Sequence, residues 1–163
     1  MISDLQLPNK CLITVDPGKA SGWGTINLSD PLNKFKFGEY PFMEMNEALD
    51  RWSKDVLQYT DPLVIVCERF TIFEDTITKS RGSTNWSIET IGVARYIAHR
   101  DGHEFVLQGA TEAKGLGTDK LLRRFGWWTV GSDHARDAAR HAVLYIAKND
   151  KKLFDLMLKE TEE

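Results

Sequence analysis

The chain has 163 residues and a mass of 18.6 kDa, the size of one ordinary domain, and we expect residues 1–163 to form a single domain. Hydrophobic residues make up 42% and charged residues 28%, which is typical of a globular protein and excludes a disordered or fibrous one. A formal net charge of −3 argues against a protein that coats nucleic acid through bulk charge, although a local basic patch is still compatible with it.

The ends of the chain carry no targeting pattern. No run of apolar residues approaches the roughly 20 that cross a bilayer, and the first ten residues lack the basic and apolar regions of a secretory signal. We therefore expect a cytoplasmic protein with no membrane partner. Residues 1–10 and 159–163 are expected to be flexible ends.

The first half of the chain predicts strands followed by a helix. Residues 11–16, 22–28 and 34–42 have the short apolar patterns of strands, and the tight links between them predict an antiparallel meander. From Met45 the apolar positions recur every three or four residues, which predicts an amphipathic helix that Pro62 ends.

The second half alternates between strands and helices. Residues 63–67 and 104–107 predict two further strands. Together with the meander, they predict an α/β fold in which helices flank a mixed five-stranded sheet. The helices predicted here are one containing Ile88, Ile91 and Ile97, a short one over 118–125, a long one over 133–148, and an extension over 153–158.

Two acidic residues follow buried strands. Asp16 ends the first strand, directly before Pro17, and Glu68 takes the same place after the strand over 63–67. If these strands are parallel neighbours, both carboxylates emerge at one edge of the sheet, where they could share a cation. For either residue alone, a strand that ends in a charge as the chain leaves the core is the simpler explanation.

The last long helix begins with further candidate ligands. His134 and Asp137 are three residues apart, and Asp133 and Asp137 four apart, so either pair shares one helix face. Ser132 or Asp133 can cap the helix, which accounts for Asp133 but not for Asp137. A carboxylate among alanines needs a cation or a base, and a neighbouring arginine is the alternative to a metal.

Converging acids of this kind predict a divalent-metal site. Without a cation the carboxylates repel one another and their pKa values rise. Their hard oxygen atoms suit Mg²⁺, with Mn²⁺ as a substitute. Two such ions can activate a water molecule and neutralise the leaving group in phosphodiester hydrolysis.

Four segments form an ordered set of motifs across residues 11–147, nearly the whole chain. They are Ile13-Thr14-Val15-Asp16-Pro17-Gly18 with Ser21-Gly22-Trp23-Gly24, then Val64-Ile65-Val66-Cys67-Glu68, the lysine-bearing segment 110–120, and His134-Ala135-Arg136-Asp137-Ala138. This set resembles the motifs of RuvC-type Holliday junction resolvases, which belong to the ribonuclease H-like superfamily. Any one motif is weak, while the ordered set is fairly specific.

The resemblance implies a ribonuclease H-like fold and a homodimeric, divalent-metal endonuclease. Each subunit would cut one of two opposed strands of a four-way DNA junction, with two Mg²⁺ ions per active site. The metal ligands that it implies are Asp16, Glu68, His134 and Asp137, with Asp133 as the alternative to His134.

The resemblance also implies a DNA surface of basic and aromatic residues. Lys114 and Lys120 would contact the scissile phosphate, Lys120 as part of the catalytic set, although ordinary surface lysines would look the same in sequence. Phe70 and Phe73 would either stack on an unpaired base or close the core. The residues implied after Glu68 are Arg69, Phe70, Phe73, Lys79 and Arg81.

Other functions fit the same residues. A ribonuclease H acting on RNA·DNA hybrids, or a nuclease of other branched DNA, would share the metal ligands. A catalytically inactive junction-binding protein would share the fold. Actin-like ATPases also have Asp-x-Gly after a strand, but they need two lobes, for which 163 residues are too few. The lysine-bearing segment and the long loop after Glu68 favour the junction endonuclease.

Overall fold

The computed structural model describes residues 10–29, 35–57, 63–71 and 85–161. Within them, one mixed sheet has the strand order β3-β2-β1-β4-β5, which confirms the predicted five strands. Strand β1 is antiparallel to β2 and parallel to β4, and β4 is parallel to β5. The strands are β1 (Cys11–Asp16), β2 (Ala20–Asn27), β3 (Lys36–Pro41), β4 (Val64–Glu68) and β5 (Glu104–Gln108).

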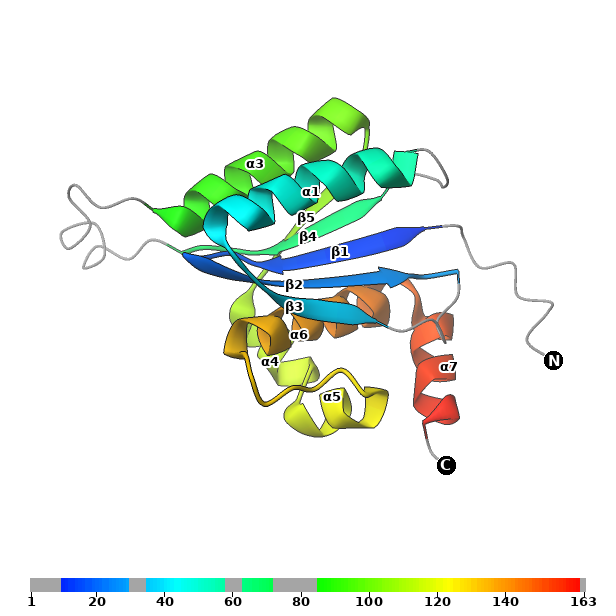
Figure 1. Ribbon diagram of the computed structural model, residues 1–163. Helices are drawn as coiled ribbons and strands as arrows, with labels where there is room; N and C mark the ends of the chain where they lie inside the picture. Colours follow the sequence, from blue (N-terminus) through cyan, green and yellow to red (C-terminus); the bar gives the residue numbers. More distant parts are fainter. Residues whose placement is uncertain (1–9, 30–34, 58–62, 72–84, 162–163) are drawn as a thin grey trace.

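Helices cover both faces of the sheet (Figure 1). On one face lie α1 (Phe42–Leu57) and α3 (Trp86–Asp101), and on the other lie α4 (Ala110–Leu116), α5 (Asp119–Phe125), α6 (Asp133–Asn149) and α7 (Lys151–Glu160). Among the described residues, no helix combines the length and the apolar character that crossing a membrane requires.

The structure differs from the sequence prediction in a few boundaries. Helix α1 begins at Phe42 and not at Met45, because the Phe42 amide bonds to the Lys19 carbonyl and its ring packs edge-on against Trp86, with centroids 4.8 Å apart. Helix α4 was not predicted, since its 7 residues hold no large apolar side chain before Leu116 and therefore show no apolar period. Most of the two ends expected to be flexible, residues 1–9 and 162–163, lie outside the described residues, and α7 continues through Glu160.

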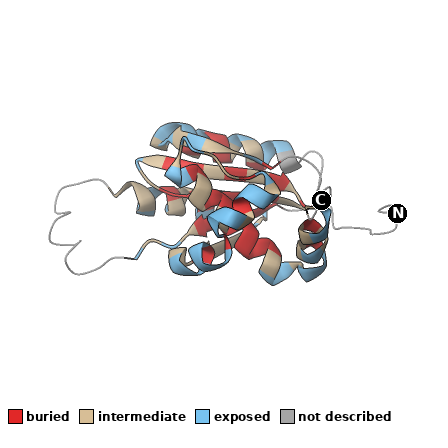
Figure 2. Cartoon of the chain, turned by 90° about the horizontal axis from the view of Figure 1, so that it is seen from below, coloured by how far each residue is buried: buried red, intermediate tan, exposed pale blue. Residues whose placement is uncertain are grey.

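Alternate residues of each strand face two separate apolar cores. In β1, Ile13 and Val15 pack with α1 and α3, whereas Leu12 packs with α6 and α7. The parallel strand β4 repeats this alternation, with Ile65 on the first side and Val66 on the second. Figure 2 shows buried residues gathered between the layers and exposed residues on the outer sides of the helices.

Helix α6 lies close against the sheet. The buried hydroxyl of Thr14 donates to the Ala138 carbonyl over 2.8 Å, which ties the helix to β1. A β-carbon at Gly22 would lie 1.9 Å from the backbone oxygen of His134, so only glycine allows this approach. The amino end of α6 is therefore held beside the carboxyl end of β1.

Candidate functional site

Three strands end in polar residues on the α6 side of the sheet. Asp16, Glu68 and Gln108 are the last residues of β1, β4 and β5, and each is two positions beyond a residue that faces α6. Because β1, β4 and β5 are parallel neighbours, the three side chains reach the same edge. Glu68 and Gln108 are direct register partners.

Asp16 is buried beneath the first turn of α6 and meets His134. The Nδ1 atom of His134 donates to Oδ2 of Asp16 over 2.6 Å. The pKa of Asp16 is raised to about 6, mainly by burial; the His134 hydrogen bond lowers it, and the negative charges of Glu68 and Asp137 add to the increase. Burial on its own would lower the pKa of His134, but the hydrogen bond and charge of Asp16 raise it overall. The Asp16 carboxyl therefore lies within the field of two other acids.

Asp137 follows on the same helix face and is held by basic side chains. Arg140 donates to its Oδ1, and Nζ of Lys114 lies 3.2 Å from its Oδ2. Arg140 also donates to the Gly117 carbonyl over 3.1 Å and pairs with Asp119, whose pKa it lowers. One arginine thus joins Asp137 to α5 and to the loop before it.

His141 joins the remaining two polar residues from one turn further along α6. Its side chain is 0% exposed, and its Nε2 lies 3.0 Å from Oε2 of Glu68. Its Nδ1 lies 2.9 Å from Oε1 of Gln108. The three residues therefore form a buried bridge from α6 to the ends of β4 and β5.

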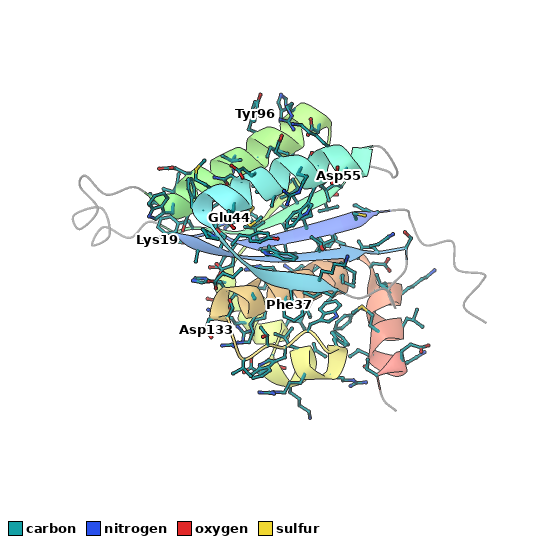
Figure 3. The ribbon with its side chains drawn as sticks, viewed as in Figure 1. Lys19, Phe37, Glu44, Asp55, Tyr96 and Asp133 are labelled. Atoms are coloured by element: carbon teal, nitrogen blue, oxygen red, sulfur yellow. The ribbon has the colours of Figure 1, made fainter. Side chains whose placement is uncertain are left out.

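Asp133 lies apart from these residues. Its carboxylate is 84% exposed and pairs with Arg136 on the surface (Figure 3). The hydroxyl of Ser132, and not Asp133, caps α6 by accepting from the Ala135 amide over 3.0 Å. The sequence left open whether His134 or Asp133 accompanies Asp137 on the helix face. In the structure His134 bonds to Asp16, whereas Asp133 is turned to solvent.

The expected DNA-contacting residues are only partly described. Lys120 is exposed in the first turn of α5, beside the Asp119 that Arg140 holds, and no ion pair is recorded for it within the described residues. Arg69 is exposed and Phe70 half-buried just beyond β4, and Phe70 is in neither apolar core as described. Phe73, Lys79 and Arg81 lie outside the described residues.

In the described part of the chain, no three histidine, cysteine or acidic side chains are arranged as a group that could hold a metal ion. Each carboxylate instead meets a basic or imidazole side chain. The donor set nevertheless fits a divalent cation, because three carboxylates offer the hard oxygen ligands that Mg²⁺ and Mn²⁺ take, and an imidazole nitrogen is a possible additional ligand. The pKa of Asp16 is raised first by burial and then by the charges of Glu68 and Asp137, and a cation between the acids would offset both effects.

The sequence interpretation missed two residues of this edge. His141 is four positions after Asp137 and seven after His134, so the same helical spacing that singled out those residues also includes it. Gln108 ends an apolar strand just as Asp16 and Glu68 do. A search for polar residues at the ends of apolar strands, without a requirement for charge, would have found it.

Comparison with known proteins gives the fold. The sequence matches no model of a known protein family and no curated protein. Among solved structures, Thermus thermophilus RuvC in complex with a Holliday junction substrate aligns with a TM-score of 0.52 at 16% identity, covering 86% of this chain and 96% of that one. This chain has the ribonuclease H-like fold of RuvC-type Holliday junction resolvases.

Further structures agree with this assignment. A second Thermus thermophilus RuvC structure aligns with a TM-score of 0.52 at 14% identity over 85% of this chain and 96% of that one. The yeast mitochondrial Holliday junction resolvase Ydc2 aligns with a TM-score of 0.50 at 13% identity over 98% of this chain and 84% of that one. At these identities the likeness concerns the RuvC fold, and the chemistry is argued from the residues at the edge of the sheet.

Proposed function

We propose that the protein is a divalent-metal-dependent endonuclease that resolves four-way DNA junctions by paired nicks. One observation carries this proposal: on a ribonuclease H-like fold, Asp16 is buried at the carboxyl edge of the sheet beside His134 and within the field of Glu68 and Asp137. A buried carboxyl with further acids around it, at the edge where parallel strands end, suits the binding of cations that cleave phosphodiesters.

Asp16, Glu68, Asp137 and His134 would hold Mg²⁺, with Mn²⁺ as a substitute. When bound, a pair of such ions supplies an activated water molecule and neutralises the leaving oxygen. The chain itself orients the acids. His134 fixes one oxygen of Asp16, and Arg140 anchors Asp137 to α5. These contacts limit the number of positions that each carboxylate can adopt.

The DNA surface of this proposal lies beside the acidic edge. The Lys114 side chain is 54% exposed and already pairs with Asp137, so its ammonium group is in position to bind a phosphate that approaches the site. Lys120, in the first turn of the neighbouring helix α5, is exposed and could contact the same DNA backbone. The proposed surface further includes Arg69 and Phe70 together with Phe73, Lys79 and Arg81.

Paired nicks need two active sites, which a homodimer would supply. Helix α3 offers an apolar surface for a second copy. Ile88 and Tyr96, 42% and 62% exposed, are two turns apart with Gly92 between them, and Tyr96 points away from the sheet (Figure 3). Among the described residues, a β-carbon at Gly92 would meet no atom beyond the neighbouring backbone of α3 itself, which leaves space for another helix. Sedimentation of the wild type against Tyr96→Glu tests this surface, since the charge would separate the copies.

A cleavage panel with Mg²⁺ tests the activity. Labelled four-way junction, fork, flap, linear duplex and RNA·DNA hybrid are each incubated with wild type, Asp137→Asn and the matched control Asp133→Asn. We expect symmetric nicking of the junction by the wild type and by Asp133→Asn. We expect no nicking by Asp137→Asn, with junction affinity equal to wild type or better, because the carboxylate serves the cation and not the DNA.

The other outcomes assign other functions. Cutting of the hybrid alone would indicate a ribonuclease H. Cutting of forks or flaps in preference to the junction would indicate a different branched substrate. Tight junction binding without cutting by any variant would indicate an inactive binding protein. Loss of activity in Asp133→Asn instead of Asp137→Asn would replace the proposed ligand set.

A further inference from the structure

The bridge of His141, Gln108 and Glu68 buries polar groups whose loss of hydration lowers the stability of the fold unless hydrogen bonds replace it. An imidazole with no exposure and an almost buried amide must both find hydrogen-bond partners, because an unpaired polar group in the interior destabilises the fold. The His141 ring finds both partners because it lies between the neutral Gln108 amide and the Glu68 carboxylate, which is itself partly exposed. The hydrogen bonds therefore lead from buried Gln108 through His141 to Glu68 near the surface.

The hydrogen-bond pattern gives Glu68 a donor in either orientation of the Gln108 amide. With the amide oxygen facing Nδ1, both ring nitrogens of His141 donate, one to Gln108 and one to Glu68. With the amide turned over, its NH₂ group donates to Nδ1, and the neutral ring still donates from Nε2 to Glu68. In both cases one carboxylate oxygen of Glu68, Oε2, accepts an N–H from a ring that cannot rotate freely.

We propose that His141, set by Gln108, is a positioning residue that fixes the Glu68 carboxylate for cation binding. This inference rests on the proposed function only in taking Glu68 as a ligand. The ring holds Oε2, and within the described residues Oε1 of Glu68 makes no hydrogen bond to the protein, so Oε1 is available to a cation. Partners of this kind, which orient a ligand without touching the ion, usually contribute strongly to metal affinity.

The first measurement is the affinity of the full chain for Mn²⁺ alone, by calorimetry, with no DNA present. We expect His141→Leu to weaken binding by about 10- to 100-fold. His141→Gln, which keeps an amide donor, should recover part of that loss. Gln108→Met removes the hydrogen bond that holds Nδ1 of His141 but keeps the contact between His141 and Glu68, so it should cause a smaller loss of Mn²⁺ affinity. This variant replaces His141→Leu if that protein does not fold.

A matched control separates positioning from stability. Ile146→Ala removes a buried side chain from the same helix without contact with Glu68, and it should lower the thermal midpoint while leaving Mn²⁺ affinity unchanged. A double-mutant cycle gives the specific readout. If His141 acts through Glu68, His141→Leu should cost no further Mn²⁺ affinity in a Glu68→Gln background.

The outcomes distinguish this inference from the proposed function. Unchanged affinity in His141→Leu, or an equal loss in the Glu68→Gln background, overturns the inference and leaves the nuclease proposal standing. Mn²⁺ binding that depends on His141 in a protein that cuts no DNA supports the inference and overturns the nuclease. Wild-type protein that binds no Mn²⁺ overturns both.

Discussion

Histidine meets carboxylate in two clusters of this molecule, at opposite ends of its parallel strands. At the amino end, Nδ1 of His103 accepts from the Leu63 amide over 3.1 Å, so the neutral ring donates from Nε2 to the Ser53 hydroxyl, 2.8 Å away. That hydroxyl donates to Asp101 over 2.5 Å, and Arg100 neutralises the same carboxylate. The Asp101 carboxylate of this cluster therefore has both a hydroxyl donor and a cation, and the same arginine also pairs with Asp50 of α1 over 2.7 Å.

The cluster at the carboxyl end is not balanced in this way. The hydrogen bond from Arg100 holds the pKa of Asp101 well below its usual range, whereas burial and the neighbouring acids raise the pKa of Asp16 to about 6. Asp101 is hydrogen-bonded to an arginine, whereas Asp16 is buried, is hydrogen-bonded to a histidine and lies in the field of two further acids. Under the proposed function, the first cluster serves stability and the second serves cation binding.

The largest effects are expected when the aspartate of each cluster, Asp16 or Asp101, is replaced by asparagine. We expect Asp16→Asn to reduce junction cleavage by at least about 1000-fold, because metal-assisted catalysis is worth several kcal/mol. Its thermal midpoint should be unchanged or higher, since repulsion among the acids is relieved. Asp101→Asn should keep wild-type cleavage and lose about 1–3 kcal/mol of unfolding free energy in urea. The reverse pattern of effects would show that the clusters have exchanged roles.

The close packing of α6 against β2 can be tested at Gly22, the glycine that allows it. Gly22→Ala should lower the unfolding free energy by about 3 kcal/mol, because the added methyl group meets the His134 backbone. Gly115→Ala is the control, since a β-carbon there meets no atom and replaces glycine within a helix, which should stabilise slightly. Urea denaturation of both variants measures the contrast. Equal stability of the two would mean that α6 is free to move away from β2.

The amino-end cluster also predicts a pH dependence of stability. Burial lowers the pKa of His103 below the unfolded value of 6.5, so the unfolded chain binds the additional proton. The stability contributed by His103 is therefore complete above that value and decreases as the pH falls below it. We expect the stability advantage of wild type over His103→Asn to shrink between about pH 7.5 and about pH 5 in urea titrations. A constant difference would contradict the hydrogen-bond pattern above.

The smallest expected effect concerns the phosphate contact proposed for Lys120. Lys120→Ala should slow cleavage and reduce the slope of log affinity against log salt concentration by about 1. Lys151→Ala, exposed on α7, is the matched control and should leave the slope unchanged. An unaltered slope in Lys120→Ala would place this lysine away from the DNA backbone.

Much of the fold was predictable because it depends on local periodicity. The short apolar runs in β1 and β4 are strand signals, and the spacing of Ala135, Ala138 and Ala142 is a helix signal. The start of α1 was not predictable in this way. It depends on contacts of Phe42 with Lys19 and Trp86, residues far from it in sequence.

The site was predictable to the extent that strand ends and helix faces determine it. Asp16 and Glu68 stood out because both end apolar strands at the same place, and Asp137 stood out because it lies among alanines on a helix face shared with His134. The choice between Asp133 and His134 was not accessible, since both spacings suit one helix face and only the Ser132 cap fixes the rotation of the first turn. The bridge through Gln108 required knowledge that β5 lies next to β4 in register.

The register between β1 and β4 makes the acidic edge sensitive to the length of each strand. Side chains alternate between the two faces, so inserting one residue within β1 would send the Asp16 carboxylate toward the apolar core of α1 and α3. Substitutions that conserve length would leave the geometry of the edge intact. Among descendants of this sequence, insertions and deletions should therefore be confined to loops, while the strands that deliver the acids vary in composition at constant length.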